Sequence, residues 1–303
     1  MIGIFDSGLG GLTILKSILN YESGTASPRL RDYNYLYLGD NARAPYGGKS
    51  QEVIYAYTCE AIDFLFAKKC KLIILACNTA SSKALRKIQQ EYLPARFGEP
   101  PVRRVLGVIR PLVEKVVHDN FKKVGVIGTR ATIESNVYEI EIMNLVKKRA
   151  DKRLSASPDI EQADQRVSAA PDIEIIQQAA PLLVPLIEEG WLNKPETKMI
   201  LKKYLRPLKT KQVDVLIPAC THYPFLLNEI QRVMTRRCAV LNPGAIVAES
   251  LASYLRRHPE LGIKPSEKPI REFYTTDSIT KFKSLGEKFL SQPINNIAKV
   301  SLS

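Results

Sequence analysis

The sequence has no unbroken apolar run long enough to cross a membrane, which requires about 20 residues. It begins directly with the apolar residues 2–5, without the basic region that opens a secretion signal. Apolar residues make up 45% of the 303 residues and charged residues 25%, which is typical of globular proteins. We therefore expect a cytoplasmic globular protein that has no membrane partner and enough residues for two ordinary domains.

Cysteines paired at short spacing are also lacking. The chain has five Cys residues, an odd number, and none is arranged in the close pairs of a zinc site. A disulfide framework is excluded on the same grounds. We therefore expect reduced thiols and no structural metal.

Acidic residues are few relative to basic ones. The chain has 44 Lys and Arg against 31 Asp and Glu, a net charge of +13. Such a charge can attract nucleic acids or anionic substrates. However, the basic residues lie in short scattered clusters, such as 147–149 and 236–237, and few have aromatic neighbours that could stack on bases. We expect a solvated basic surface rather than a nucleic-acid site.

Apolar segments with the length of strands alternate with segments of helical periodicity, for example after residues 76 and 224. This alternation predicts an α/β protein built on parallel sheets with crossover helices. The expected strands are residues 2–5, 35–38, 72–76, 105–109, 124–128, 173–177, 213–217, 239–241 and 272–275.

The order of these segments indicates two similar α/β domains with a cleft between them. We expect the chain to enter the second domain near Arg110-Pro111 and to return after Cys220. The first domain would then be discontinuous, with residues 1–109 and 225–303, and the second would be the insertion 110–224. Residues 151–172 are rich in Ser, Ala, Pro and Asp, and we interpret them as a flexible surface insertion.

Two look-alike apolar runs each end in Ala-Cys, at Cys77 and at Cys220. Each is followed by small polar residues and then by a helical pattern, over residues 81–91 and 225–236. In open α/β folds, ligands bind at the carboxyl ends of strands and the amino ends of helices, where a thiolate is also favoured. Either Cys alone would be interpreted as a small buried apolar residue. Two thiols on opposite sides of one small molecule could remove a proton from one face and return one to the other.

The segment 6–11, Asp-Ser-Gly-Leu-Gly-Gly, follows the first strand. Its glycines allow backbone N–H groups to surround an anion, with Asp6 as a charged helper. A tight turn in which Asp6 caps a helix is the alternative. The segment is not a dinucleotide fingerprint, because Thr13 stands at the position of the third glycine, and it has no phosphate-binding Lys.

Other polar residues near strand ends have both a functional and a plain structural interpretation. His222 could raise the thiolate fraction of Cys220 or relay a proton. Glu188 can be interpreted as a solvated residue at the end of a helix, and Tyr46-Gly47 as a turn within a loop. Thr129 and Thr132 fit a helix cap.

Taken together, six ordered motifs that span most of the chain resemble the glutamate racemases of the cofactor-independent aspartate/glutamate racemase superfamily. The motifs are the segments 5–13, 38–40 with 45–47, 76–80, 128–132, 184–188 and 220–224. The chain departs from the usual motifs at Ala219, where the family has Gly, and at Asn41, where it has Thr.

The resemblance implies racemisation of L-glutamate to D-glutamate for peptidoglycan, in a fold of two similar α/β domains, without cofactor or metal and commonly in a homodimer. Cys77 would act on the D-enantiomer with help from Asp6, and Cys220 on the L-enantiomer with help from Glu188 and His222. The substrate-binding residues implied by the motifs are Asp6, Ser7, Tyr46, Gly47, Asn78, Thr79, Thr129, Thr132, Thr221 and His222.

Two alternatives stay open. The first is a racemase of aspartate or another acidic amino acid on the same fold. The second is a regulatory protein that interacts with DNA or gyrase, suggested by the net charge of +13.

Overall fold

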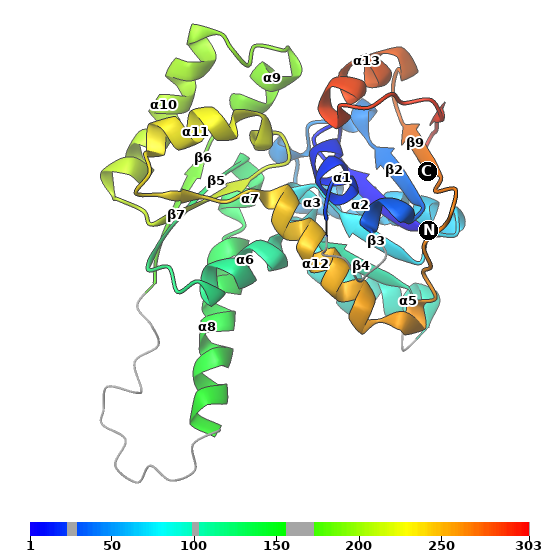
Figure 1. Cartoon of the computed structure of the whole chain (residues 1–303), viewed down its shortest axis with the longest axis horizontal. Helices are drawn as coiled ribbons and strands as arrows, with labels where there is room; N and C mark the ends of the chain where they lie inside the picture. The colour runs from blue at the N-terminus through cyan, green and yellow to red at the C-terminus, as the bar shows by residue number, and fades with distance from the viewer. Residues whose placement is uncertain (23–28, 99–102, 156–172, 303) are drawn as a thin grey trace.

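The computed structural model describes residues 1–22, 29–98, 103–155 and 173–302. Within these ranges the strands form two parallel sheets, one of six strands and one of four. Figure 1 shows the sheets in two lobes, with helix α12 (Pro243–Arg257) between them, where it packs on helices of both lobes. The expected class, two parallel-sheet α/β units, is confirmed. Most of the expected insertion, residues 156–172, lies outside the described residues.

The first sheet has the strand order β10-β9-β2-β1-β3-β4. Its strands are β1 (Ile2–Asp6), β2 (Tyr35–Gly39), β3 (Leu72–Leu75), β4 (Arg104–Gly107), β9 (Arg271–Thr275) and β10 (Ile297–Lys299). Its associated helices and turns are α1 (Leu12–Leu19), η1 (Leu30–Asp32), η2 (Asn41–Arg43), η3 (Tyr46–Gly48), α2 (Gln51–Ala67), α3 (Asn78–Lys83), α4 (Leu85–Lys87), η4 (Ile88–Tyr92), α5 (Leu93–Phe97), η6 (Pro259–Leu261) and α13 (Ile279–Leu290).

The second sheet has the strand order β6-β5-β7-β8. Its strands are β5 (Lys123–Gly128), β6 (Glu174–Ala179), β7 (Val215–Ala219) and β8 (Ala239–Val240). Its associated helices and turns are α6 (Ile109–His118), α7 (Arg130–Glu134), α8 (Val137–Ser155), α9 (Leu183–Glu188), α10 (Pro195–Thr210), η5 (Tyr223–Leu226) and α11 (Leu227–Met234).

Strands buried on both faces explain the continuous apolar runs of the sequence. In β2, Tyr35 and Tyr37 point into the core that includes α1, whereas Leu36 and Leu38 point into the core beneath α2. The second sheet likewise packs α6 and α8 against one face and α10 against the other. Both faces of each sheet are thus covered by helices. Backbone and side-chain polar groups can therefore contact a ligand only at the strand ends.

The expected return of the chain to the first domain at residue 225 is at odds with the sheet topology. Strand β8 pairs in parallel with β7, so α11 and β8 complete the second sheet by one crossover. The chain passes over to the first sheet only through α12. The short β8 carries too little apolar pattern to indicate which sheet it joins. Strand β10 at the edge of the first sheet was not expected at all.

The expected helix 81–91 also differs. The first helix after β3 begins at Asn78, breaks at Ala84 and continues as α4 and the π-helical turn η4. The early start has a local cause, because the Cys77 side chain accepts a hydrogen bond from the Ala80 N–H.

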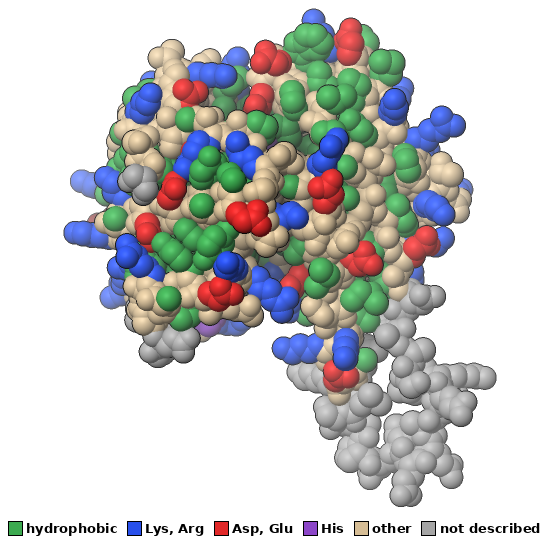
Figure 2. Space-filling model, turned by 180° about the vertical axis from the view of Figure 1, so that it is seen from behind, with side chains coloured by type: hydrophobic (Ala, Val, Ile, Leu, Met, Phe, Trp, Pro, Cys, Tyr) green, Lys and Arg blue, Asp and Glu red, His purple; other side chains and the backbone are tan. Residues whose placement is uncertain are grey.

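The surface agrees with the expected dispersed charge on the face that Figure 2 shows. Lys and Arg side chains are spread over it, with Asp and Glu side chains and apolar groups between them. Within the described ranges, no helix is both long and apolar enough to span a membrane.

Candidate active site

A cavity of about 350 Å³ lies where the carboxyl ends of the two sheets meet. Both cysteines line it, Cys77 just after β3 and Cys220 directly after β7. The sequence-predicted residues that line the cavity are Ser7, Tyr46, Gly47, Cys77, Asn78, Thr79, Thr129, Glu188, Cys220, Thr221 and His222. The topology therefore brings the two thiols, which are 143 residues apart in the chain, to one cavity.

The Cys77 thiol is only 5% exposed and lies 3.4 Å from the Ser7 hydroxyl. Burial, reinforced by the nearby Asp6 carboxyl, raises the pKa of Cys77 to about 12. The hydrogen bonds to Ser7 and to the Ala80 N–H oppose this shift. Cys77 is therefore a neutral thiol at neutral pH, able to donate a proton.

Cys220 begins a chain of polar groups. Its sulfur lies 3.9 Å from Nδ1 of His222, and Nε2 of His222 lies 3.0 Å from Oε1 of Glu188. Burial lowers the pKa of His222, but contacts with Cys220 and Glu188 outweigh it and raise that pKa to about 10. Burial likewise opposes ionisation of Glu188, yet His222 keeps the pKa of Glu188 below its usual value. A protonated imidazole is therefore held beside the Cys220 sulfur.

Asp6 is fully buried and lies behind the cavity wall rather than in it. Its carboxyl group accepts hydrogen bonds from the Gly8 N–H at 3.0 Å and from the Thr221 hydroxyl at 3.2 Å. Burial raises the pKa of Asp6, and the positive His222 opposes that shift. Asp6 thus stabilises the turn and joins the two lobes, while α1, whose N-cap residue is Gly11, has no side-chain cap.

The hydroxyl of Thr132 is also absent from the cavity lining. It lies 3.0 Å from the Thr129 hydroxyl and 3.4 Å from that of Thr79, so three hydroxyls meet across the two lobes. Thr129 also caps α7, as the plain interpretation expected. The Thr129 side chain therefore both caps α7 and lines the cavity.

Sequence reasoning missed Tyr138 of α8, whose hydroxyl donates to Oδ1 of Asn78 at 2.7 Å. The apolar spacing indicated a helix, but nothing in it showed that this buried phenol reaches the other lobe. The cavity wall also includes Ala44, Pro45, Gly48, Arg130, Pro181, Val184 and Pro185. Among the residues that the structure describes, no group of three or more His, Cys, Asp or Glu side chains could hold a metal ion.

Gly10 allows the two lobes to approach closely. A Cβ at this position would lie 2.2 Å from the Thr221 hydroxyl and 2.6 Å from Nδ1 of His222. We expect Gly10→Ala to lower the free energy of unfolding by about 1–3 kcal/mol, the usual cost of overpacking. Urea unfolding measures this loss. Gly48→Ala is the matched control, because its Cβ would meet nothing within 4 Å; equal stability of the two variants would contradict the prediction.

No family model matches this chain. The glutamate racemase of Syntrophus aciditrophicus is 35% identical over 303 residues, which cover 99% of this chain and 96% of the relative. The crystal structure of glutamate racemase from Francisella tularensis in complex with D-glutamate matches with a TM-score of 0.78 and 32% identity, covering 99% of this chain and 97% of that one. A glutamate racemase structure from Bacillus anthracis matches with a TM-score of 0.80 and 28% identity, covering 100% and 97%.

These relatives confirm the resemblance in the motifs and extend it over nearly the full length of both chains. The chain belongs to the glutamate racemase family.

Proposed function

We propose that this protein interconverts L- and D-glutamate by a two-thiol mechanism, with Cys77 and Cys220 as its catalytic acid and base. The observation that carries the proposal is the placement of both thiols, from two different sheets, in one cavity. The D-glutamate complex of the Francisella tularensis relative supports glutamate as the substrate.

In the direction from L to D, the Cys220 thiolate takes the α-proton and forms an S–H bond. The electron pair of the Cα–H bond stays on the substrate and spreads into its α-carboxylate. The Cys77 thiol then gives its proton to the opposite face of the carbon, which yields D-glutamate and a Cys77 thiolate. The reverse reaction starts from this protonation state and exchanges the two roles. Before a second turnover from L to D, Cys220 must release its proton to solvent and Cys77 must take one up, and no oxidant is needed.

The surrounding groups have supporting roles in this proposal. His222 and Glu188 stabilise the Cys220 thiolate, and Asp6 assists Cys77. The residues that would bind the substrate are Ser7, Tyr46, Gly47, Asn78, Thr79, Thr129 and Thr221, with Asp6, Thr132 and His222 behind or beside them. Preorganised donors of this kind stabilise developing charge in a closed site, where they contribute more than in water.

Family membership also supports a cellular setting. We propose a cytoplasmic homodimer that supplies D-glutamate for peptidoglycan. Sedimentation at several protein concentrations tests the dimer, and a single species with the mass of one chain would contradict it.

A substrate panel tests the reaction. Purified protein with a metal chelator and no added cofactor should convert either enantiomer of glutamate to an equal mixture, measured by chiral chromatography. Aspartate should react more slowly by roughly ten- to two-hundredfold, the usual discrimination for one methylene. Faster turnover of aspartate would show that glutamate is the wrong substrate, and no turnover of either would contradict the racemase proposal.

A further inference from the structure

We propose that Asp40 is a positioning residue, which holds the substrate-facing loop 44–48 in place through Tyr46, Arg43 and Thr276. The inference rests on the proposed function for its effect on substrate binding, and on the structure alone for its effect on the loop. Loop 44–48 forms one wall of the cavity. Asp40 itself does not line the cavity, and its side chain is completely buried.

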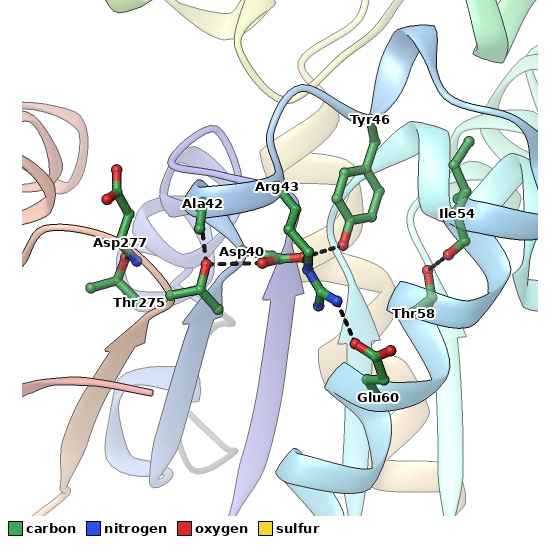
Figure 3. Close-up of polar contacts among 10 residues, drawn as sticks. Asp40, Ala42, Arg43, Tyr46, Ile54, Thr58, Glu60, Thr275 and Asp277 are labelled. Atoms are coloured by element: carbon green, nitrogen blue, oxygen red, sulfur yellow. Dashed lines mark hydrogen bonds and ion pairs between the residues drawn. The ribbon is translucent and has the colours of Figure 1, made fainter. Parts of the chain in front are cut away.

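The Asp40 carboxylate gathers donors from three places. Arg43 Nε donates to Oδ2 at 2.7 Å, and the Tyr46 hydroxyl donates to the same oxygen. The Thr276 hydroxyl donates to Oδ1 at 2.9 Å. Figure 3 shows Asp40 beside Arg43 and joined to Tyr46 by a dashed line, with Arg43 reaching on to Glu60 of α2. A buried carboxylate with this many partners resists any movement of the side chains that donate to it.

Tyr46 connects the Asp40 carboxylate to the loop that lines the cavity. Its ring is 1% exposed and packs near Phe5 and Tyr57, with ring centroids 6.2 and 5.8 Å away. Burial and the adjacent Asp40 raise the pKa of Tyr46 well above its usual value, so the phenol stays protonated and continues to donate. The backbone at Tyr46 then leads directly into Gly47 and Gly48. Tyr46, Gly47 and Gly48 all line the cavity, so fixing Tyr46 fixes the stretch of chain that faces the substrate.

The opposite end of the network comes from the segment after β9. The Thr276 hydroxyl accepts a hydrogen bond from the Ala42 N–H at 3.0 Å while it donates to Asp40. The Thr276 N–H also donates to the Gly39 carbonyl at 3.2 Å. One side chain, 236 residues from Asp40 in sequence, therefore binds both the carboxylate and the backbone of the turn that precedes the loop.

Thr276 is the decisive residue to change, because it binds Asp40 but does not line the cavity. Thr276→Val keeps the shape of the side chain but leaves Asp40 Oδ1 and the Ala42 N–H without their partner. Thr276→Ser keeps the hydroxyl and should restore the wild-type behaviour. Loosening the loop weakens binding of the substrate and of the transition state alike, so KM should rise by roughly tenfold while kcat changes little.

A second pair of variants distinguishes the effect of losing a hydrogen bond to Asp40 from the effect of losing any buried tyrosine hydrogen bond. Tyr46→Phe removes the phenol that donates to Asp40. Its matched control is Tyr92→Phe, which removes a phenol that donates to Oδ2 of Asp63 at 2.8 Å in the same lobe, away from the cavity. We expect a raised KM for glutamate in Tyr46→Phe and an unchanged KM in Tyr92→Phe.

The readout that does not depend on catalysis is hydrogen exchange of the peptide 39–49 in the full chain without substrate. Thr276→Val should speed exchange in this peptide, and Thr276→Ser should not. An unchanged exchange rate, an unchanged KM in an active Thr276→Val enzyme, or an equal rise of KM in Tyr92→Phe would each overturn the positioning role. If the wild-type protein does not turn over glutamate, the proposed function fails, and hydrogen exchange alone decides whether Asp40 and Thr276 order the loop.

Discussion

Replacing either Cys77 or Cys220 by Ser should lower kcat/KM for glutamate racemisation by roughly a hundredfold to ten-thousandfold, the usual contribution of a general acid or base. A serine hydroxyl fills the same space, but it is a far weaker acid than a thiol and does not ionise near neutral pH. The cavity and its backbone donors would remain, so substrate binding should change much less than turnover.

The loss should be equal in the two directions. The two enantiomers have the same free energy in water, so their equilibrium ratio is one, and the ratio of kcat/KM for D- and L-glutamate must also stay at one in every variant. Polarimetry started from each enantiomer measures both values. Cys238→Ser is the control, since Cys238 is also buried but lies outside the cavity, before β8, and this variant should match the wild type.

Exchange of the α-proton with deuterated water distinguishes the two faces. In Cys220→Ser, Cys77 remains as a base and should exchange the α-proton of D-glutamate without inverting it. In Cys77→Ser, Cys220 should exchange only that of L-glutamate. Proton exchange from both enantiomers in a single variant would contradict the assignment of one thiol to each face.

The cysteines could be predicted from the sequence because every part of their signal is local. An apolar run predicts a buried strand, and the next residues are then placed at the ligand-binding edge of a parallel sheet. The same rule predicts four polar residues of the site, because each lies within a few residues of the end of a strand. They are Ser7, Asn78, Thr79 and Thr221.

The other half of the site could not be predicted from local pattern, because it depends on pairs that are distant in sequence. Glu188 meets His222 across 34 residues, and Tyr138 meets Asn78 across 60. In sequence, Glu188 has the features of a solvated helix end. The strand near residue 239 was predicted, but its assignment to the first domain was wrong for a similar reason, because a two-residue strand has too little pattern to indicate its sheet.

The imidazolium of His222 leads to the second large effect, on the dependence of turnover on pH. We expect kcat/KM of the wild-type enzyme to fall as pH rises through about 10, where His222 loses its proton. The Cys77 thiol keeps its proton through that range, because its pKa is raised to about 12. The quantity to measure is kcat/KM, since its dependence on pH reports the ionisation of the free enzyme, to which this pKa belongs.

Two variants test whether His222 and its partner cause this fall. His222→Asn removes the imidazolium, so kcat/KM at neutral pH should drop by roughly a hundredfold and the fall near pH 10 should vanish. Glu188→Gln removes one of the groups that raise the pKa of His222, so the fall should move to lower pH. A fall at the same pH in His222→Asn as in the wild type would assign it to another group.

The same ionisation should also affect folding, with a definite sign. The pKa of His222 is about 6.5 in the unfolded chain and is raised to about 10 in the folded protein, so folding favours proton uptake between these values. The stability that this group contributes is complete below pH 6.5 and is lost as pH rises through about 10. Urea unfolding of the wild type and His222→Asn at pH 6, 8 and 10 should therefore give a stability difference that shrinks as pH rises. A difference that grows with pH would mean that His222 is buried neutral, and the Cys220 thiolate would then lack the positive partner that the mechanism requires.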